Sequence, residues 1–296
     1  MPSPEKGVGV RVLNHNLSQQ TRRLTMKFLL ILLCGVATWF AFKTNVLLGF
    51  AVMVAFIAYG AYKFMPSFYR LRGQKCFGMG DFAGAEKMYK KAVDTGRGGY
   101  QIRLEYSYML LRTGRFEEAE QQVSYILSHK LTPAERNNAV LRRCMCYYKL
   151  GNLEEAISDA QELYDEGYKS MALYALLGYF KIIIAPNSED TFNFCLEAYD
   201  YADDDRDICD NLLICYYNRG EYEKAKEISD KVIEKAPKFV EAWYHAAQID
   251  YKMKNYEEAL EKLDKINDCI RSEMTTISEE EIKQLRNDIE FKLRVK

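Results

Sequence analysis

From about residue 66 to about residue 270, hydrophobic residues recur with spacings of three and four positions. Because residues at these spacings share one face of an α-helix, the pattern predicts helices that each bury one stripe. The stripe is clearest at five places, which are Ala85/Tyr89/Ala92, Ala119/Val123/Ile126, Ala156/Ala160/Leu163, Ala225/Ser229/Val232 and Ala259/Leu263/Ile266. The pattern therefore predicts an all-α body.

A short turn precedes each of these stripes. A glycine tolerates the positive φ that ends a helix, a following Asp or Asn can cap the next helix, and Glu in the first turn suits the helix dipole. The turn therefore predicts a corner between two antiparallel helices. Its five copies are Gly80-Asp81-Phe82-Ala83-Gly84-Ala85, Gly114-Arg115-Phe116-Glu117-Glu118-Ala119, Gly151-Asn152-Leu153-Glu154-Glu155-Ala156, Gly220-Glu221-Tyr222-Glu223-Lys224-Ala225 and Lys254-Asn255-Tyr256-Glu257-Glu258-Ala259.

The alanines that end these turns are spaced by 34, 37, 69 and 34 residues. The interval of 69 is nearly two periods, so it predicts a further helix pair between Ala156 and Ala225. Tyr174, Leu177 and Gly178 fit its first helix, and Ala185-Pro186-Asn187-Ser188 replaces the glycine corner. Six helix pairs are therefore expected, the fourth with a displaced turn.

The first helices also carry a small residue at a corresponding position, namely Gly73, Ser107, Cys144, Gly178 and Ala247, and only Leu213 departs. With the turns and the 34-residue period, these residues resemble the tetratricopeptide repeat (TPR) family. The resemblance implies a right-handed helical-hairpin solenoid of about six units over residues 66–270. Residues 271–296 are expected to form a C-terminal capping helix, because acids open this segment and bases end it.

The same resemblance implies a binding function without catalysis. In this family the first helix of each pair lines a concave groove, where a partner helix or an extended apolar segment would fit. Relatives that hold the acidic tail of heat-shock chaperones use Lys, Arg and Asn there, whereas this chain offers only Arg70, Arg112 and Asn138, so such a tail is not expected. The predicted partner-binding residues are Phe77, Tyr108, Met145, Tyr148, Tyr179, Ile214, Tyr217, Tyr244 and Tyr251.

The beginning of the chain has a different pattern. Residues 1–25 are polar and basic and are expected to be disordered. Two apolar runs follow, Phe28–Phe42 and Val46–Tyr62, separated by Lys43-Thr44-Asn45. One helix over both runs would be about 57 Å long, against a bilayer core of about 30 Å. Residues 26–64 are therefore predicted to form a transmembrane hairpin of two spans.

Basic residues flank this hairpin on both outer sides, whereas Lys43 alone lies between the runs. The positive-inside rule then places both chain ends, and the repeat body, in the cytoplasm. Two alternatives remain open. Thr21-Arg22-Arg23-Leu24-Thr25-Met26-Lys27 partly resembles a twin-arginine export signal, and the short runs would also suit an interfacial or re-entrant loop.

Charge and chemistry narrow the function further. Residues 1–64 hold seven Lys or Arg and one acid, while the rest hold 34 basic and 41 acidic residues, so the body has no basic footprint for nucleic acid. The eight cysteines have no chelating spacing and are expected to be reduced, without disulfide or zinc. Asp203, Asp205 and Asp207 suggest a calcium loop, but Ile208 and Ile214 stand where Gly and Glu are needed.

No catalytic motif is present, and His245 is expected on a helix surface. We therefore expect no enzyme, no cofactor and no metal. The leading hypothesis is a membrane-anchored TPR adaptor that contacts the lipid bilayer through residues 26–64 and binds a protein or peptide partner on the cytoplasmic face. The alternative is an exported or outward-facing accessory factor in envelope assembly or secretion. The acidic stretch 189–210 is a second possible docking surface.

Overall fold

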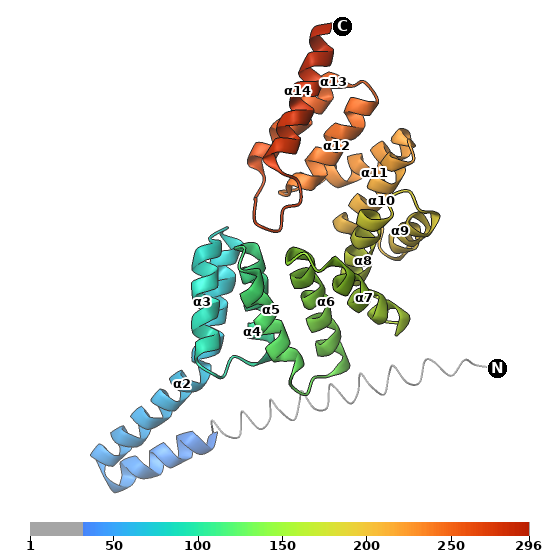
Figure 1. Cartoon of the computed structure of the whole chain (residues 1–296). Coiled ribbons are helices and arrows are strands. Elements are labelled where there is room, and N and C mark those ends of the chain that lie inside the picture. Colours follow the sequence, from blue (N-terminus) through green and yellow to red (C-terminus); the bar gives the residue numbers. More distant parts are fainter. Residues whose placement is uncertain (1–31, 296) are drawn as a thin grey trace, which may run out of the picture. The chain divides into compact units, whose positions relative to one another are not determined.

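The computed structural model describes residues 32–295, so the predicted disordered segment 1–25 lies outside the described residues. Every regular element in the described part is a helix. The chain divides into two compact units, residues 1–65 and residues 66–296, which we describe separately. Figure 1 gives the order and labels of the helices.

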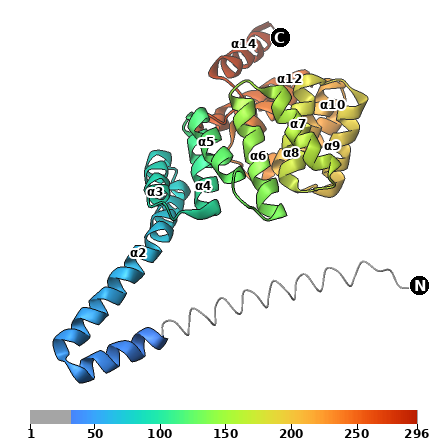
Figure 2. The same cartoon turned by 60° about the horizontal axis from the view of Figure 1, so that its bottom comes forward.

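The first unit contains a sharp corner at the polar triplet. The helix Leu32–Thr44 ends there and α2 (Val46–Gly78) begins directly after Asn45. The Asn45 side chain accepts hydrogen bonds from the amides of Leu47 and Leu48, at 2.8 and 3.3 Å, as an N-terminal cap does. Gly49 allows close approach, because a Cβ there would lie 2.3 Å from the Phe42 ring. Figures 1 and 2 both show the chain turning at this point.

The helix α2 is longer than the predicted second span. It continues past Tyr62 and Pro66 to Gly78, so the apolar run and the first helix of the first repeat form one helix. Among the described residues, α2 alone is long and apolar enough to cross a membrane, and the helix before it is shorter. The two-span anchor of residues 26–64 therefore stays a prediction.

The second unit is built from successive helix pairs. The end of α2 packs on α3, since a Cβ at Gly73 would lie 3.0 Å from the Tyr89 ring. Counting this pair, six helix pairs occur in order within the described residues, as the 69-residue interval predicts. The helices after α2 are α3 (Phe82–Asp94), α4 (Gly99–Arg112), α5 (Phe116–Leu127), α6 (Pro133–Lys149), α7 (Leu153–Asp165), α8 (Met171–Ile184), α9 (Glu189–Tyr201), α10 (Arg206–Asn218), α11 (Tyr222–Glu234), α12 (Val240–Lys252) and α13 (Tyr256–Lys265).

The five predicted corners adopt a left-handed backbone at their first residue. Gly80, Gly114, Gly151 and Gly220 have φ between 76° and 84°, and Lys254 takes the same role at φ 66°. The capping prediction holds only at Asp81, which accepts from the Gly84 amide; the other four cap positions make no side-chain cap bond. The alanine that ends each corner is fully buried, because the neighbouring helix packs against it.

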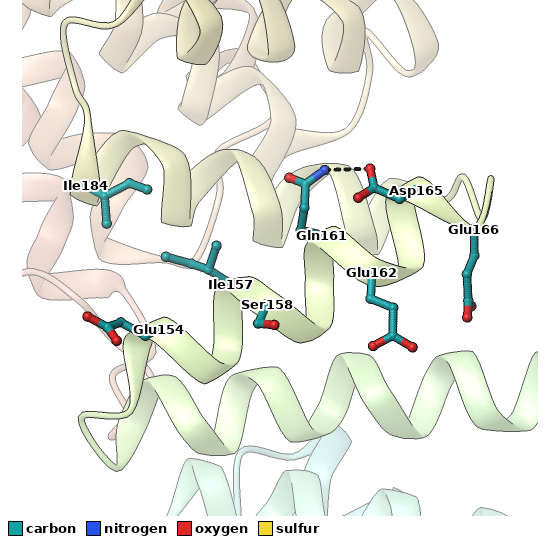
Figure 3. A pocket seen from close by; sticks show the side chains of 8 residues that line it. All are labelled: Glu154, Ile157, Ser158, Gln161, Glu162, Asp165, Glu166 and Ile184. Carbon is teal, nitrogen blue, oxygen red and sulfur yellow. Dashed lines mark hydrogen bonds between the residues drawn. The ribbon is translucent and has the colours of Figure 1, made fainter.

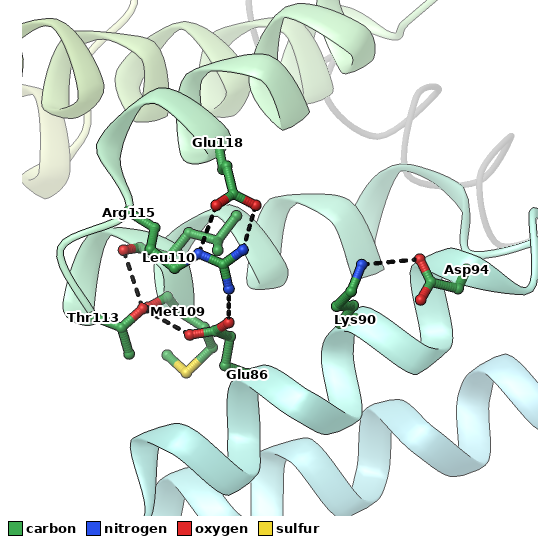
Figure 4. Close-up of polar contacts among 8 residues, drawn as sticks. All are labelled: Glu86, Lys90, Asp94, Met109, Leu110, Thr113, Arg115 and Glu118. Atoms are coloured by element: carbon green, nitrogen blue, oxygen red, sulfur yellow. Dashed lines mark hydrogen bonds and ion pairs between the residues drawn. The ribbon is translucent and has the colours of Figure 1, made fainter.

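Polar contacts join neighbouring pairs at these corners. Arg115, at the α4–α5 corner, reaches Glu86 on α3 and Glu118 on α5, as Figure 4 shows. The Thr113 hydroxyl donates to the same Glu86 carboxylate at 2.9 Å. The corner of the second repeat is thus tied to the second helix of the first, which fixes the spacing of the two pairs.

The fourth pair has the displaced turn that the sequence predicts. Helix α8 ends at Ile184, and Ser188 caps α9 by accepting from the Asp190 amide at 3.2 Å. Gly178 on α8 lets α10 approach, since a Cβ there would lie 2.9 Å from Asn211 Nδ2. That amide donates to the carbonyl oxygen of Ala175 at 2.7 Å, so the polar side chain is satisfied inside the core.

The chain ends in α14 (Glu279–Val295), after the short 3₁₀ helix Ile266–Asp268. Ser278 and Glu281 form a reciprocal capping box at its start. Its buried residues Ile282, Leu285 and Ile289 join the hydrophobic cluster of α12 and α13. This helix therefore covers the apolar face that the last repeat presents, while its other face is charged.

Candidate partner-binding cavity

A cavity of about 480 Å³ lies among the first helices of the repeats. We call it the inner cavity. All of its lining residues come from α4, α6, α8, α10, the start of α12 and the α13–α14 connection (residues 269–278), and none comes from a second helix. The first helices thus face a shared space, as the resemblance implies. The lining includes Leu104, Arg112, Asn138, Arg142, Met145, Tyr148, Leu176, Tyr179, Asp207, Asp210, Glu241, Ile270 and Met274.

Tyr148 and Tyr179 form the aromatic part of the wall. Their rings pack edge to face with centroids 5.6 Å apart, and their hydroxyl oxygens are 2.8 Å apart in a hydrogen bond. Burial, followed by the bond to Tyr148, raises the pKa of Tyr179 well above its ordinary value. Met145 lies one helical turn from Tyr148 and lines the same cavity. These three predicted site residues are therefore brought together.

The other six predicted site residues do not line the inner cavity. Tyr108 belongs to the cluster of the first repeats, and its ring packs on that of Phe77 with centroids 6.1 Å apart. Ile214 and Tyr217 pack with α11, where burial raises the pKa of Tyr217 to about 12. Tyr244 and Tyr251 belong to the cluster beneath α14. The predicted aromatic row is thus divided among four packing clusters, because neighbouring helices cover part of it.

Arg142 on α6 is a lining residue that sequence reasoning missed. Its guanidinium lies 4.6 Å from the Tyr108 ring centre and donates to Met145 Sδ at 3.4 Å. No carboxylate among residues 32–295 pairs with it, and its Nε is buried without a hydrogen-bond partner. Burial lowers its pKa, although an arginine stays charged. A signal was available, since Arg142 lies four residues after Asn138 on the same helix face.

Acidic residues form another part of the wall. Asp207 and Asp210 on α10 and Glu241 on α12 line the cavity. His245 Nδ1 lies 2.8 Å from Asp210 Oδ1 and is only 13% exposed. Burial lowers the pKa of His245, but the Asp210 carboxylate outweighs it and leaves that pKa raised. The prediction of a surface histidine was therefore wrong, because α12 turns this side chain towards α10.

The α13–α14 connection closes one side of the inner cavity. The Ile270 amide donates to the Lys238 carbonyl at 2.8 Å, and the Thr276 amide donates to Glu241 Oε1 at 2.7 Å. Between them, the Glu273 amide donates to the carbonyl of Arg112, on α4, at 3.3 Å. The sequence pattern predicts most of this segment, from residue 271, to belong to the C-terminal capping helix. Its contact with α4 could not be predicted from a local pattern.

A second hollow lies on the outer helix α7. It is lined by Glu154, Ile157, Ser158, Gln161, Glu162, Asp165 and Glu166, with Ile184 from the end of α8 (Figure 3). This hollow is open and half of its lining residues are acidic, and the Gln161 side chain there donates to Asp165 at 2.9 Å. It has no convergent aromatic groups, so the inner cavity is the stronger candidate.

The described part of the chain contains no candidate metal-binding site. No group of three or more His, Cys, Asp or Glu among residues 32–295 is placed to hold a metal ion. All eight cysteines are free, and five of them are buried. Burial raises the pKa of Cys144 and of Cys146 to about 12, so these two thiols stay protonated.

Comparisons with known proteins agree with this architecture. Residues 72–135 match the family model described as tetratricopeptide repeat, and residues 197–266 match that of anaphase-promoting complex, cyclosome, subunit 3. A tetratricopeptide repeat protein from Parabacteroides merdae is 17% identical, with 78% of this chain and 87% of that chain covered and a TM-score of 0.51.

A second solved structure, the thermophilic TPR protein TTC0263 from Thermus thermophilus, is 14% identical. The match covers 65% of this chain and 100% of that chain, with a TM-score of 0.52. No curated protein matches the chain. At such identities the likeness concerns the fold, and the predicted all-α repeat solenoid is confirmed.

Proposed function

We infer that this chain, whose body is an array of tetratricopeptide repeats, is an interaction scaffold that holds a protein or peptide partner in its inner cavity. The observation that carries this proposal is the lining of that cavity. It combines two tyrosines, a methionine and an unpaired arginine, and it comes from the first helices of five successive repeats. Proteins with this fold are typically non-enzymatic scaffolds, which agrees with the absence of catalytic motifs from the sequence.

The chemistry of the lining suits a macromolecular partner. Tyrosine, arginine and methionine are enriched where proteins bind one another, since each offers a large contact area together with a polar or adaptable group. Tyr148 and Tyr179 hold each other in place, which lowers the entropy that binding would cost. A helix or an extended segment with apolar side chains would complete such a cavity.

Affinity capture with matched tyrosine variants tests the proposal. Tyr148→Ala removes a wall of the cavity, whereas Tyr217→Ala removes a similarly half-buried tyrosine outside it. We expect Tyr148→Ala to weaken capture from solubilised membranes by at least about 1 kcal/mol, which is about fivefold, and Tyr217→Ala to leave it unchanged. Helical content, followed by circular dichroism, should be equal in both variants. Equal capture by both variants, with the fold intact, would exclude the inner cavity.

We further propose that residues 26–64 anchor the scaffold in a membrane, with the repeat body in the cytoplasm. In the described part of this segment, large apolar side chains are exposed, including Leu47, Phe50 and Ile57. Such a surface is unfavourable in water and favourable in lipid. Lys43 lies 4.6 Å from the centre of the Trp39 ring, a pair suited to a membrane interface.

Reporter fusions at the C-terminus test this topology. A reporter active only in the cytoplasm should work, and one active only outside should not, because basic residues flank the apolar segment on both outer sides. The opposite result would favour the alternative function, an outward-facing accessory factor in envelope assembly or secretion.

A further inference from the structure

We propose that the α13–α14 connection is an internal occupant of the partner site, and that the partner is an extended segment that displaces it. This inference rests on the proposed binding function and adds the kind of partner and its competitor. It is carried by three features of the connection: its backbone bonds, its side-chain contacts and the group that it leaves unpaired.

The backbone of the connection is bound much as a peptide ligand would be. It begins beside the last repeat, where the Ile270 amide reaches Lys238, and it crosses to α4, where the Glu273 amide reaches the Arg112 carbonyl. It then returns to α12, where both the amide and the hydroxyl of Thr276 donate to Glu241 Oε1, at 2.7 and 3.1 Å. The acceptors therefore belong to the second and sixth repeats, and the segment spans the cavity between them.

The side chains of the connection contact surfaces near the cavity. Met274 packs against the hydrophobic cluster of the first repeats, which also includes Tyr108 and Met145. The Glu273 side chain lies over Gly114, where a Cβ would be 2.9 Å from its Cγ. A bulkier residue at that corner would push the connection away. The site thus already accommodates one extended segment with a methionine in its apolar part.

The hold on the connection is light, as displacement requires. Three of its amides bond to the rest of the array, and one of these bonds is 3.3 Å long. Ile270 remains 49% exposed although it lines the cavity. The turn at the centre of the connection is closed within itself, since the Thr275 amide donates to the Ser272 carbonyl at 2.9 Å. Displacement of residues 270–276 would therefore break three backbone hydrogen bonds to the array and the apolar contact of Met274.

The connection also leaves Arg142 unsatisfied. Its Nε is buried without a partner, although it belongs to the same lining as Met274. A buried donor without an acceptor is unfavourable, so a ligand that supplies an oxygen there gains an interaction that the connection lacks. The partner that fits best is an extended segment with a methionine-like side chain for the Met274 position and an acceptor for Arg142.

A peptide in trans tests the inference without knowledge of the natural partner. The probe is a fluorescent synthetic peptide with the sequence of residues 268–278, and its binding to the full chain in detergent is followed by anisotropy. In one variant, residues 270–276 are replaced by a Gly-Ser sequence of equal length. We expect this variant to bind the peptide at least about tenfold more tightly than the unaltered chain, whose site is filled. A peptide with Met274→Ala should bind the variant at least about fivefold more weakly.

A second variant guards against loss of folding in the first. Met274→Ala in the full chain keeps the connection but weakens its contact, and it should bind the unaltered peptide more tightly than the unaltered chain does. Equal binding to the folded variants and the unaltered chain would overturn the inference, as would no binding to any of them. If capture of the natural partner still depended on Tyr148 in that case, the proposed function would stand without the competing segment.

Discussion

Asp250 on α12 is fully buried, and its carboxylate lies between two lysines from the neighbouring helices. Lys226 on α11 is 3.1 Å from Oδ1, and Lys262 on α13 contacts Oδ2. Burial alone would lower the pKa of Lys226, but Asp250 outweighs it and leaves that pKa raised. We predict that Asp250→Asn destabilises the last two repeats, because it leaves both ammonium groups facing a neutral amide.

The size of the effect follows from the exposure of the three groups. Removal of one partner from a buried ion pair costs about 3–5 kcal/mol, because the other charge stays buried. Lys262 is 13% exposed and Lys226 is 31% exposed, and the amide keeps the shape and one acceptor oxygen. The lower end, about 3 kcal/mol, is therefore expected. For a unit of this size that is a fall in Tm of about 6–12 °C.

Thermal and urea unfolding, followed by far-UV circular dichroism, measure the loss. Asp230→Asn is the matched control, since Asp230 lies 3.4 Å from Lys226 and 3.9 Å from Lys262 but is half exposed. It should cost less than about 1 kcal/mol. Adding Lys262→Met to Asp250→Asn should restore at least about 1 kcal/mol, because the more buried of the two unpaired ammonium groups is then gone. Equal losses for the two single variants would refute the role assigned to burial.

Two further predictions concern the Glu197 carboxylate and the reactivity of the cysteines. Hydrogen bonds from Lys169, Tyr174 and Tyr164 lower the pKa of Glu197 to about 2, so its contribution is present above its ordinary pKa near 4.5 and is lost as pH falls towards 2. Glu197→Gln should therefore be less stable than the unaltered chain at pH 7. The difference in their free energies of unfolding should shrink as the pH falls from 4.5 to about 2. A difference that stays constant over this range would contradict the prediction. In the folded chain, alkylation should reach the exposed part of Cys269 well before the buried thiols. All eight should react after denaturation, and a smaller count would reveal a modified or paired cysteine.

The repeat architecture could be predicted from the sequence because its determinants are local. Each corner needs a left-handed residue and a small residue five positions later, and these appear as a visible motif. Even the eroded fourth pair was located, because Ser188 still caps its second helix and Gly178 still permits close packing. The capping prediction failed at Asn152 and Asn255, whose side chains make no cap bond.

The site was predicted only in part, because its composition depends on contacts between distant segments. Met145, Tyr148 and Tyr179, which helical spacing placed on one face, line the inner cavity, and their role in binding stays a prediction. That spacing could not show that α11 and α14 pack against the later tyrosines. Continuation of α2 through Pro66 was also unexpected, since proline usually marks a boundary. The position of the α13–α14 connection against the cavity depends on its bond to Arg112, which lies far away in the sequence.

That bond between the Glu273 amide and the Arg112 carbonyl also has a consequence for how the array unfolds. In an ordinary repeat array each unit contacts only its neighbours, so the ends fray independently and unfolding can proceed unit by unit. Here a segment after the last repeat is bonded to the second, which couples the opening of one end to that of the other. Release of the connection would remove this coupling, and the same long-range contact would form late in folding.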